Sequence, residues 1–427
     1  MHILPRFKTV IAGLFLLMSL PVYADSAGYE KLFSDGSLEG WKRVGPAHFE
    51  MNGHVLHGWG SFDRNSFLVS AQQYRDFDLK LDVRIEQESN SGIQIRSHVV
   101  DDRLVGYQLE IDGSKRSWSG GLYHEGGVGW LQSLENNSQG RSAFKVGQWN
   151  KYRIQALGPR IRCWVNDVLC ADYIDRRDRI GHIAFQVHSG DCQVWWRDAQ
   201  IRILAEPQSA TLKQAQHDLL ETPVPGNAQS LFDGSSLSRW GHGDEKPARW
   251  KIEDGAMEVM PGTGSLLTRE ALGGGVLFLE FCVPNTTTNR QGQDRGNSGV
   301  YLQGRYEVQV LDSAGLACAS NRCGGIYGVA APAVNMALPP GQWQTYLIEF
   351  TPPVYDETGT KKEMAELTVY HNGVRIHDDV SIETNTGAGH QEGPGPAPLL
   401  LQDHGHPVQF RNIWFVPDIK VPKPVRS

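Results

Sequence analysis

The sequence has little of what marks nucleic-acid-binding, membrane-spanning or zinc-binding proteins. Its 427 residues include 41 Lys and Arg against 48 Asp and Glu, a formal net charge of −7, and they contain no basic run. This balance argues against a nucleic-acid surface, which needs clustered positive charge. Past the N-terminus, no apolar stretch approaches the ~20 residues that span a bilayer. No CxxC pair is present, so the six cysteines make a poor zinc site.

Amphipathic helical stretches are also scarce, and so are long apolar strands alternating with helices, which counts against an α/β fold. Glycine (47 residues), proline (22) and tryptophan (12) are plentiful instead. Turn signals such as "NG", "ND", "DG" and "GG" separate short segments of alternating apolar and polar residues. This pattern predicts an all-β protein, with an antiparallel β-sandwich of the jelly-roll or lectin type as its architecture.

The N-terminus has the pattern of an export signal. "MHILPRFKTVIAGLFLLMSLPVYADS" places two basic residues before an apolar run, followed by "VYA". A secretory signal peptide over residues 1–24 is therefore expected, cleaved after Ala24, with a retained anchor as the weaker alternative. No cysteine follows the cleavage site to take a lipid. The mature chain is predicted to be periplasmic or secreted.

The chain repeats one set of motifs in the same order. "SNSGIQIR" (89–96) returns as "GNSGVYLQ" (296–303), "GYQLEID" (106–112) as "RYEVQVLD" (305–312), and "GQWNKYRI" (147–154) as "GQWQTYLI" (341–348). Ordered repetition over this length indicates a domain duplication. The predicted organisation is a first β-sandwich over 25–204, a linker over 205–228, a second β-sandwich over 229–418 and a tail over 419–427.

Six cysteines in an exported chain invite disulfides. Cys163 and Cys170 flank "WVNDVL", and a two-residue turn at Asn166-Asp167 would bring them face to face. We therefore predict a disulfide between them. Cys318 and Cys323 could close a small loop, which would leave Cys192 and Cys282 unpaired.

The segment "NSGVYLQGRYEVQVLDSAG" (297–315) reads as a β-hairpin with chemistry on one face. Its apolar residues alternate as a buried face should, and the opposite face holds Tyr301, Gln303, Arg305, Glu307 and Gln309. This polar row is either a solvated surface or a binding site. Glu307 is the leading candidate for a base or acid, the alternative being an ion-paired strand residue.

With these motifs in view, both halves resemble the 3-keto-disaccharide hydrolase family. The recurring pattern "LFdG…W", "NSGI-x-x-R", "GYEvQi-D", "G-iY", "p-geWN", "NG" and "Q-H…FRNI" occurs almost completely in each half. The resemblance implies a concanavalin-like β-sandwich and cleavage of glycosides already oxidised at C3. Each copy departs from the pattern once, with Gln108 in place of Glu and Gln303 in place of Arg. Which half is catalytic therefore stays open.

A 3-keto group acidifies the C2 hydrogen, so a base can form an enolate and expel the aglycone from C1, after which water adds back. The expected catalytic residues are Glu307 and His404, on a concave face of the second sandwich. The expected substrate-binding residues are Asn297, Gln303, Gln309, Asp312, Tyr327 and Gln402, with Arg96, Glu110, Tyr123 and His188 in the first half.

Several of these residues have ordinary alternatives. Asp312 is as well explained as a turn former, Asn297 as a turn cap and Tyr327 as a core aromatic. His404 and His406 are spaced for metal ligation, so a divalent metal is open, although no cofactor is certain. Trp118 and Trp130 are placed to stack on a sugar, whereas Trp41, Trp149, Trp240 and Trp343 are expected in the core.

Three functions compete on the sequence alone. The first is an enzyme whose partner is an oxidised, 3-keto sugar or oligosaccharide. The second is a non-catalytic, lectin-like carbohydrate-binding protein, because this fold serves both roles. A conventional glycosidase or lyase is the third. The grouping of Glu307, Asp312 and His404 favours the enzyme.

Overall fold

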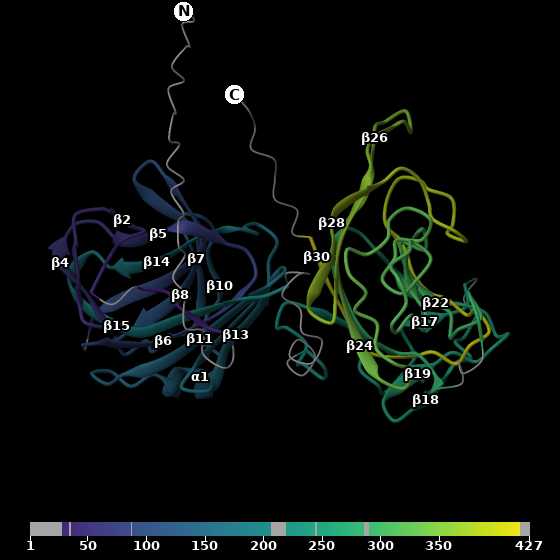
Figure 1. Cartoon of the computed structure of the whole chain (residues 1–427), viewed down its shortest axis with the longest axis horizontal. Coiled ribbons are helices and arrows are strands. Elements are labelled where there is room, and N and C mark those ends of the chain that lie inside the picture. The colour runs from purple at the N-terminus through teal and green to yellow at the C-terminus, as the bar shows by residue number, and fades with distance from the viewer. Residues whose placement is uncertain are drawn as a thin grey trace, which may run out of the picture.

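The structure is a computed structural model that describes residues 28–33, 36–86, 88–205, 219–243, 246–285 and 290–418. The predicted signal peptide and tail lie outside these residues, as does most of the predicted linker. Two β-sandwich bodies lie side by side, one built from β1–β15 and the other from β16–β30 (Figure 1). The prediction of an all-β fold with two tandem sandwiches is confirmed. Within the described ranges, no helix is long and apolar enough to cross a membrane.

The first body packs an eight-stranded sheet A against a seven-stranded sheet B, and neighbouring strands pair antiparallel. In spatial order, sheet A consists of β13 (Val168–Ile174), β12 (Arg160–Val165), β11 (Asn150–Leu157), β6 (Phe77–Ile85), β15 (Gly190–Ile203), β4 (Val55–Phe62) and β3 (His48–Asn52), with β1 (Glu30–Lys31) paired to β15. Sheet B consists of β10 (Gly129–Gln132), β9 (Leu122–Glu125), β8 (Arg103–Asp112), β7 (Asn90–Val100), β14 (Gly181–Val187), β5 (Ser66–Tyr74) and β2 (Trp41–Val44). The helix α1 (Ser138–Ala143) precedes β11.

The second body repeats this plan with an eight-stranded sheet C and a five-stranded sheet D. Sheet C consists of β18 (Lys251–Glu253), β19 (Ala256–Glu258), β30 (Gln409–Pro417), β21 (Gly275–Cys282), β24 (Trp343–Thr351), β27 (Ala365–His371) and β28 (Val374–Ile382), with β16 (Gln229–Phe232) paired to β30. Sheet D consists of β17 (Trp240–Gly241), β20 (Leu266–Leu272), β29 (Ala397–Leu401), β22 (Ser298–Leu302) and β23 (Tyr306–Val310). A separate hairpin joins β25 (Val354–Tyr355) to β26 (Lys361–Glu363).

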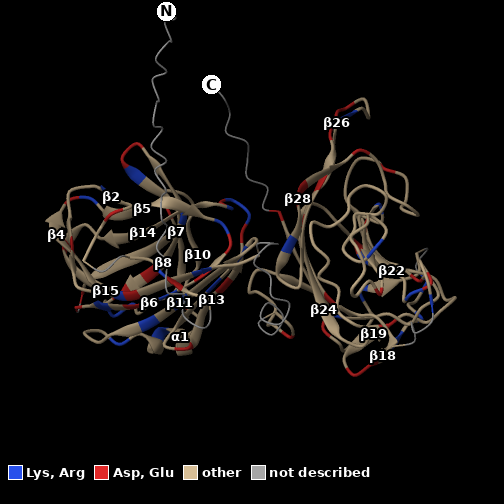
Figure 2. Cartoon of the chain, in the orientation of Figure 1, with Lys and Arg blue, Asp and Glu red and all other residues tan. Residues whose placement is uncertain are grey.

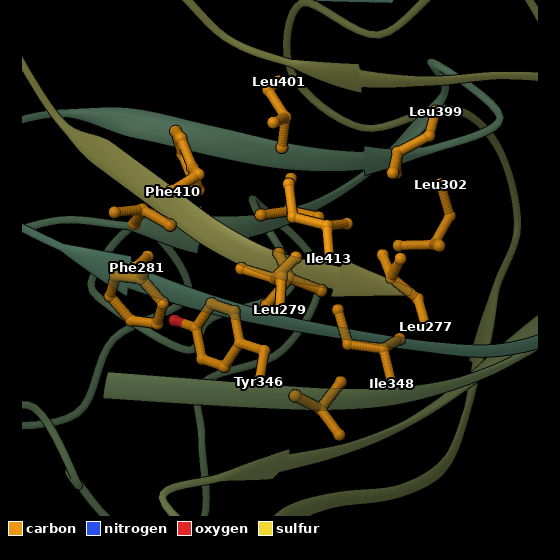
Figure 3. Packing of buried hydrophobic residues seen from close by; sticks show 14 of the residues in the cluster. Leu277, Leu279, Phe281, Leu302, Tyr346, Ile348, Leu399, Leu401, Phe410 and Ile413 are labelled. Atoms are coloured by element: carbon orange, nitrogen blue, oxygen red, sulfur yellow. The ribbon is translucent and has the colours of Figure 1, made fainter. Parts of the chain in front are cut away.

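Alternation along the strands places one core inside each sandwich. In the second body, Leu302, Leu399 and Leu401 of sheet D face Phe281 and Ile348 of sheet C (Figure 3). These side chains are at most 3 % exposed. Because successive strand residues point to opposite faces, burying this set turns the polar row of β22 and β23 away from sheet C.

The predicted Cys163–Cys170 disulfide is wrong, and all six cysteines are free thiols. The two-residue turn is as expected, since Asn166 and Asp167 both have positive φ and Val165 pairs with Val168. One step further the register shifts, so Cys163 lies opposite Ala171 and Cys170 becomes the extra residue of a β-bulge. The suggested Cys318–Cys323 bridge is absent too, because Cys323 is buried and Cys318 is exposed.

The matched tryptophans divide into two groups. Trp240 is fully buried, as expected, and Trp41 packs against the first core. Trp149 and Trp343 are instead half-buried, each beneath a guanidinium 4.2 Å from its ring, Arg197 for the first and Arg411 for the second. The prediction that these two are core residues is wrong, because cation–π contact at a sheet surface satisfies them.

The two bodies meet along an apolar seam bordered by ion pairs. Leu157 and Ile174 of the first body join Phe278, Leu347 and Trp414 of the second in one buried cluster. Charged residues of both signs lie on the facing edges of the two bodies (Figure 2).

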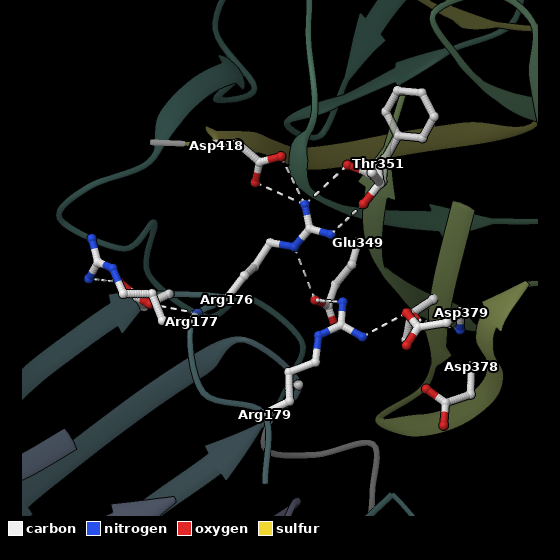
Figure 4. Close-up of polar contacts among 12 residues, drawn as sticks. Arg176, Arg177, Arg179, Glu349, Thr351, Asp378, Asp379 and Asp418 are labelled. Carbon is white, nitrogen blue, oxygen red and sulfur yellow. Dashed lines mark hydrogen bonds and ion pairs between the residues drawn. The ribbon is translucent and has the colours of Figure 1, made fainter. Parts of the chain in front are cut away.

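The ion pairs of this seam are closely spaced. Arg176 reaches Asp418 at 2.9 Å, and Arg179 reaches Glu349 and Asp379, each at 2.7 Å (Figure 4). Glu349 is buried, and burial raises its pKa while the arginines oppose the shift. These contacts fix the two bodies in one relative orientation.

Candidate functional site

The hairpin β22–β23 provides the floor of the candidate site. Val300 pairs with Val308 on the core side, and Tyr301 pairs with Glu307 on the face turned away from sheet C. The turn between the strands has three residues, Gln303-Gly304-Arg305. Cross-strand pairing therefore brings Tyr301 and Glu307 into direct contact on one face.

Glu307 is a carboxylic acid enclosed by protein, with 3 % of its surface exposed. A Cβ on Gly299 would stand 2.4 Å from Glu307 Oε1, and one on Gly387 would stand 3.1 Å from Oε2. The carboxyl group therefore lies between these two glycines. Burial raises its pKa to about 7, and a hydrogen bond from Tyr301 opposes this shift only in part. A group with this pKa is matched to proton transfer near neutral pH.

Tyr301 connects Glu307 to Gln402. The Tyr301 hydroxyl is hydrogen-bonded to the Glu307 carboxyl group, and Gln402 Nε2 donates to the same hydroxyl over 3.1 Å. Since the amide can only donate there, the phenol proton points to Glu307. Burial and the nearby carboxylate raise the pKa of Tyr301, which keeps the phenol protonated at rest.

A cavity of about 430 Å³ opens beside this chain of hydrogen bonds. Its wall includes Tyr301 and Gln402 from the floor, Leu267 and Leu400 from sheet D, and polar residues from three loops, which are His242, Lys246, Arg249, Thr263, Ser265 and His390. This volume is within the usual range for small-molecule sites. The cationic groups of Lys246 and Arg249 favour negative charge in the cavity.

The segment 383–396 covers Glu307 and is held at several points. Thr386 Oγ1 accepts the Glu307 backbone N–H at 2.7 Å. At its other end Glu392 forms an ion pair with Lys361 of β26 and accepts a 2.5 Å hydrogen bond from the Tyr306 hydroxyl. These contacts hold the segment over the hairpin, with His390 in the cavity wall.

The other polar residues expected around Glu307 lie further along the row. Gln309 Nε2 donates to Asn297 Oδ1 at 2.8 Å, and Asp312 accepts from Arg295 at 2.6 Å. Gln303 is not on the polar face at all. It sits in the turn with a φ of 54°, and its amide donates to the carbonyl of Leu272. Positive φ redirects its side chain, which strand alternation alone does not predict.

Tyr327 lies beside Glu307, and His404 does not line the cavity. The Tyr327 N–H donates to the Glu307 carbonyl, and its ring would be 3.0 Å from a Cβ on Gly387. His404 is exposed in a turn and stacks on His406, whose Nε2 is 3.2 Å from Asp294. Across the described ranges, no group of three His, Cys, Asp or Glu is arranged to hold a metal ion.

The first half places glutamines at the three positions that form the Glu307 site. Gln108 matches Glu307 and Gln94 matches Tyr301, and Gln94 Nε2 donates to Gln108 Oε1 at 2.6 Å. Gln186 matches Gln402, and its backbone carbonyl accepts from the hydroxyl of Ser91, the residue before Gly92, at 2.6 Å. A Cβ on Gly92 would stand 2.4 Å from Gln108 Cδ. Gly92 therefore matches Gly299, the glycine beneath the Glu307 carboxyl group in the floor of the site, and each is called the floor glycine of its half.

Glu110, the carboxylate of the first half, is one step further along its strand and is fully engaged. It accepts from Asn90 at 2.7 Å, from Gln108 at 3.0 Å and from Arg116 at 2.6 Å. Burial raises its pKa, and these three donors oppose the shift. Tyr123 lies nearby on the neighbouring strand, opposite Gln108.

Arg96 and His188 lie apart from this group. Arg96 is 1 % exposed and donates to the carbonyls of Arg75 and Gly158, each at 2.7 Å, and to Asp76. It braces the interior near the seam and is too deeply buried to contact a sugar. His188 is half-buried, with Nδ1 bonded to the Ser189 carbonyl.

A family comparison agrees with this duplicated architecture. The model of the 3-keto-α-glucoside-1,2-lyase-like domain matches residues 28–202 and again residues 227–416. The chain belongs to this family. Both matched regions contain a hairpin with a glycine at the same position, Gly92 in the first and Gly299 in the second.

Individual relatives match about half of the chain. A 3-keto-disaccharide hydrolase of Bacteroides thetaiotaomicron is 27 % identical over 256 residues, which cover 49 % of this chain and 85 % of the relative. A Parabacteroides distasonis crystal structure, assigned provisionally to the glycosyl hydrolases, is 35 % identical with a TM-score of 0.43 and covers 46 % of this chain and 85 % of that one. The carbohydrate-binding module CBM66 of Bacillus subtilis is 18 % identical with a TM-score of 0.32, covering 38 % and 95 %.

The sequence placed Tyr301 on the polar row without assigning it a role, and it gave no sign of His390 or of the two cations of the cavity wall. Tyr301 could have been found, because the three-residue turn sets it opposite Glu307. His390, Lys246 and Arg249 come from loops remote in sequence, and no periodic signal marks them.

Proposed function

We propose that the second half cleaves glycosidic bonds of 3-keto-glycosides by removing the C2 proton. The observation that carries this proposal is Glu307, a buried carboxyl group with a pKa of about 7 that reaches a sugar-sized cavity through Tyr301. An ordinary glycosidase would present two carboxylates across the scissile bond. Among the described residues that line the cavity, none carries a carboxylate, and proton abstraction next to a ketone needs only one base.

In the proposed first step, the C2–H bond breaks and the phenol oxygen of Tyr301 takes the proton while its own proton passes to Glu307. The electron pair of C2–H becomes the C2=C3 bond of an enolate, with negative charge on the C3 oxygen. Lys246 and Arg249, and the amide of Gln402, stabilise that charge. Glu307 is the proton acceptor, and Tyr301 is the group that touches the substrate.

In the second step the enolate electrons form a C1=C2 bond, and the C1–O bond breaks with its electron pair on the leaving oxygen. In this proposal His390, which lines the cavity, protonates that oxygen. This elimination spans C1 and C2, as the words "1,2-lyase" in the family description do. Addition of water to C1, with return of a proton to C2, completes a net hydrolysis.

The remaining site residues have supporting roles in this proposal. The polar row beyond Glu307 is held in place by two contacts. Gln309 bonds Asn297, and Arg295 bonds Asp312. Tyr327 borders the covering segment beside Glu307. The expected exported location suits a partner that is an oxidised sugar outside the cytoplasm.

The test compares 3-keto-trehalose with trehalose as substrates for the full chain. We expect product only from the oxidised sugar, and Glu307→Gln should reduce kcat by roughly a hundredfold or more while the fold persists. Tyr301→Phe should have an effect of similar size. Glu50→Gln, which changes an exposed carboxylate on β3, is the matched control. Full activity of Glu307→Gln, or equal cleavage of trehalose, would contradict the proposal.

A further inference from the structure

The first half retains the shape of the Glu307 site without its proton-transfer groups. Gln108, Gln94 and Gln186 occupy the positions of Glu307, Tyr301 and Gln402 above an equivalent floor glycine. An amide side chain neither gains nor loses a proton near neutral pH. The three positions therefore keep hydrogen-bonding capacity and lose the means to move a proton.

Of these three glutamines, Gln94 and Gln108 bond each other, whereas the amide of Gln186 stays unpaired among the described residues. It is fully buried, and neither its amide nitrogen nor its amide oxygen has a hydrogen-bond partner within the described ranges. Leaving a buried amide unpaired destabilises the folded chain. Hydroxyl groups suit such a side chain, because one hydroxyl can accept from the nitrogen and another can donate to the oxygen.

The edge of this row is open and aromatic. Arg116, with 39 % of its side chain exposed, bonds Glu110 and Asp112 and lies 5.0 Å from the ring of Trp118 and 5.2 Å from that of Trp130. The two indoles are half-buried and meet edge to face at 4.9 Å. Tyr123 packs against Trp130 at 5.2 Å.

Taken together, these groups combine charged and amide hydrogen-bonding side chains with an aromatic wall. Such a wall contacts the C–H face of a pyranose, while the partly exposed guanidinium of Arg116 addresses its hydroxyls. In the second half, by contrast, the matching positions carry the base and the phenol of the cavity.

We propose that the first half is a carbohydrate-binding site that holds a sugar without cleaving it, through Arg116, Trp118, Tyr123 and Trp130 at the open edge of the glutamine row. The ligand class rests on the proposed function of the second half. One chain then binds two sugar units, one of which is turned over.

The test titrates the full chain carrying Glu307→Gln with trehalose and with 3-keto-trehalose by calorimetry, with product analysis of each mixture. We expect two molecules of 3-keto-trehalose bound per chain and no product. Adding Trp130→Ala should lower the stoichiometry to one or weaken one of the two sites at least tenfold. Trp164→Ala, a half-buried indole between Arg153 and Arg162 on the other sheet, is the matched control and should leave both sites intact.

One bound molecule per chain, unchanged by Trp130→Ala, would overturn the inference. So would product formation that Glu307→Gln leaves intact and Trp130→Ala abolishes, because the first half would then be the enzyme. Product formation that neither substitution changes would defeat the proposed function of Glu307. In that case a second site lost on Trp130→Ala, measured with trehalose, would still support binding by the first half.

Discussion

The carboxyl group of Glu307 lies directly over the α-carbon of Gly299, so close that a methyl group there would stand 2.4 Å from Oε1. The same relationship joins Gly92 to Gln108 in the first half. This contact explains the glycine of the "NSG" motif without any appeal to unusual backbone angles. In each half, the first strand of the hairpin needs a glycine at this position because the second strand lays the side chain of Glu307 or Gln108 across it.

Gly299→Ala should therefore displace Glu307 and lower kcat/KM by at least tenfold, with a loss of stability of about 1–3 kcal/mol from overpacking. The measurement is turnover of 3-keto-trehalose together with urea unfolding. Gly92→Ala is the matched control, since it should show a similar loss of stability and keep turnover within about threefold. Equal losses of turnover in both variants would mean that the geometry over Gly299 is not specific to catalysis.

The pH dependence of turnover should follow the ionisation of Glu307. Because the proposed base must be deprotonated and its pKa is about 7, kcat/KM should rise with pH and reach half of its plateau near pH 7. A base with an ordinary carboxyl pKa would instead give a flat profile above about pH 5.5. Turnover measured from pH 5 to 9 at constant ionic strength separates these outcomes.

Stability should depend on the same group in the opposite direction. Between the ordinary pKa of 4.5 and the folded value of about 7, the folded state holds a proton that the unfolded chain has released. The free energy of unfolding should therefore fall as pH rises through this window, by on the order of 3 kcal/mol in total. Glu307→Gln removes this loss, so its Tm should exceed that of the wild type at pH 8 and match it near pH 4.5. A wild type that is the more stable protein at pH 8 would contradict the burial argument.

Arg96 should be a structural residue. Arg96→Met leaves the buried carboxylate of Asp76 with less compensation, and the free energy of unfolding should fall by about 3 kcal/mol or more. Arg84→Met, which removes an exposed pair with Glu86, should cost about 1 kcal/mol or less. Denaturant unfolding measures both, and comparable losses would show that Arg96 is not a buried brace.

The thiols should respond to labelling in a way that reports the register of the β12–β13 hairpin. One thiol per native chain, that of Cys318, should react quickly without reductant, because the other five are buried. All six should react in denaturant. Only four reactive thiols in denaturant would indicate a disulfide, and peptide mapping that joins Cys163 to Cys170 would contradict this register.

Features set by short-range periodicity could be predicted from the sequence. Alternation in "YEVQV" placed Glu307 and Gln309 on one face, and the duplicated motifs led to two sandwiches. The predicted pairing of Cys163 with Cys170 was wrong because a β-bulge depends on packing, which the sequence does not reveal. Here Cys170 packs against Gly120, whose added Cβ would stand 2.7 Å from Cys170 Cβ. The prediction that Gln303 lies on the polar face was wrong because Gln303 itself is a turn residue with positive φ.

The cavity wall could not be predicted, for a related reason. The covering segment meets the hairpin only through tertiary contacts, such as that between Thr386 and the Glu307 backbone. His390 therefore reaches the cavity, while His404, close in sequence to Gln402, turns outward. Strand patterns constrain residues a few positions apart and carry no information about which loop folds over them.

The tryptophan–arginine contacts of Trp149 with Arg197 and Trp343 with Arg411, each at 4.2 Å, also repeat from one half to the other. A contact found at matched places in both halves belongs to the plan that the two sandwiches share, which extends to their surface cation–π pairs. The exchange of glutamate and glutamine between the two hairpins changes the chemistry of one sheet face and leaves that plan intact.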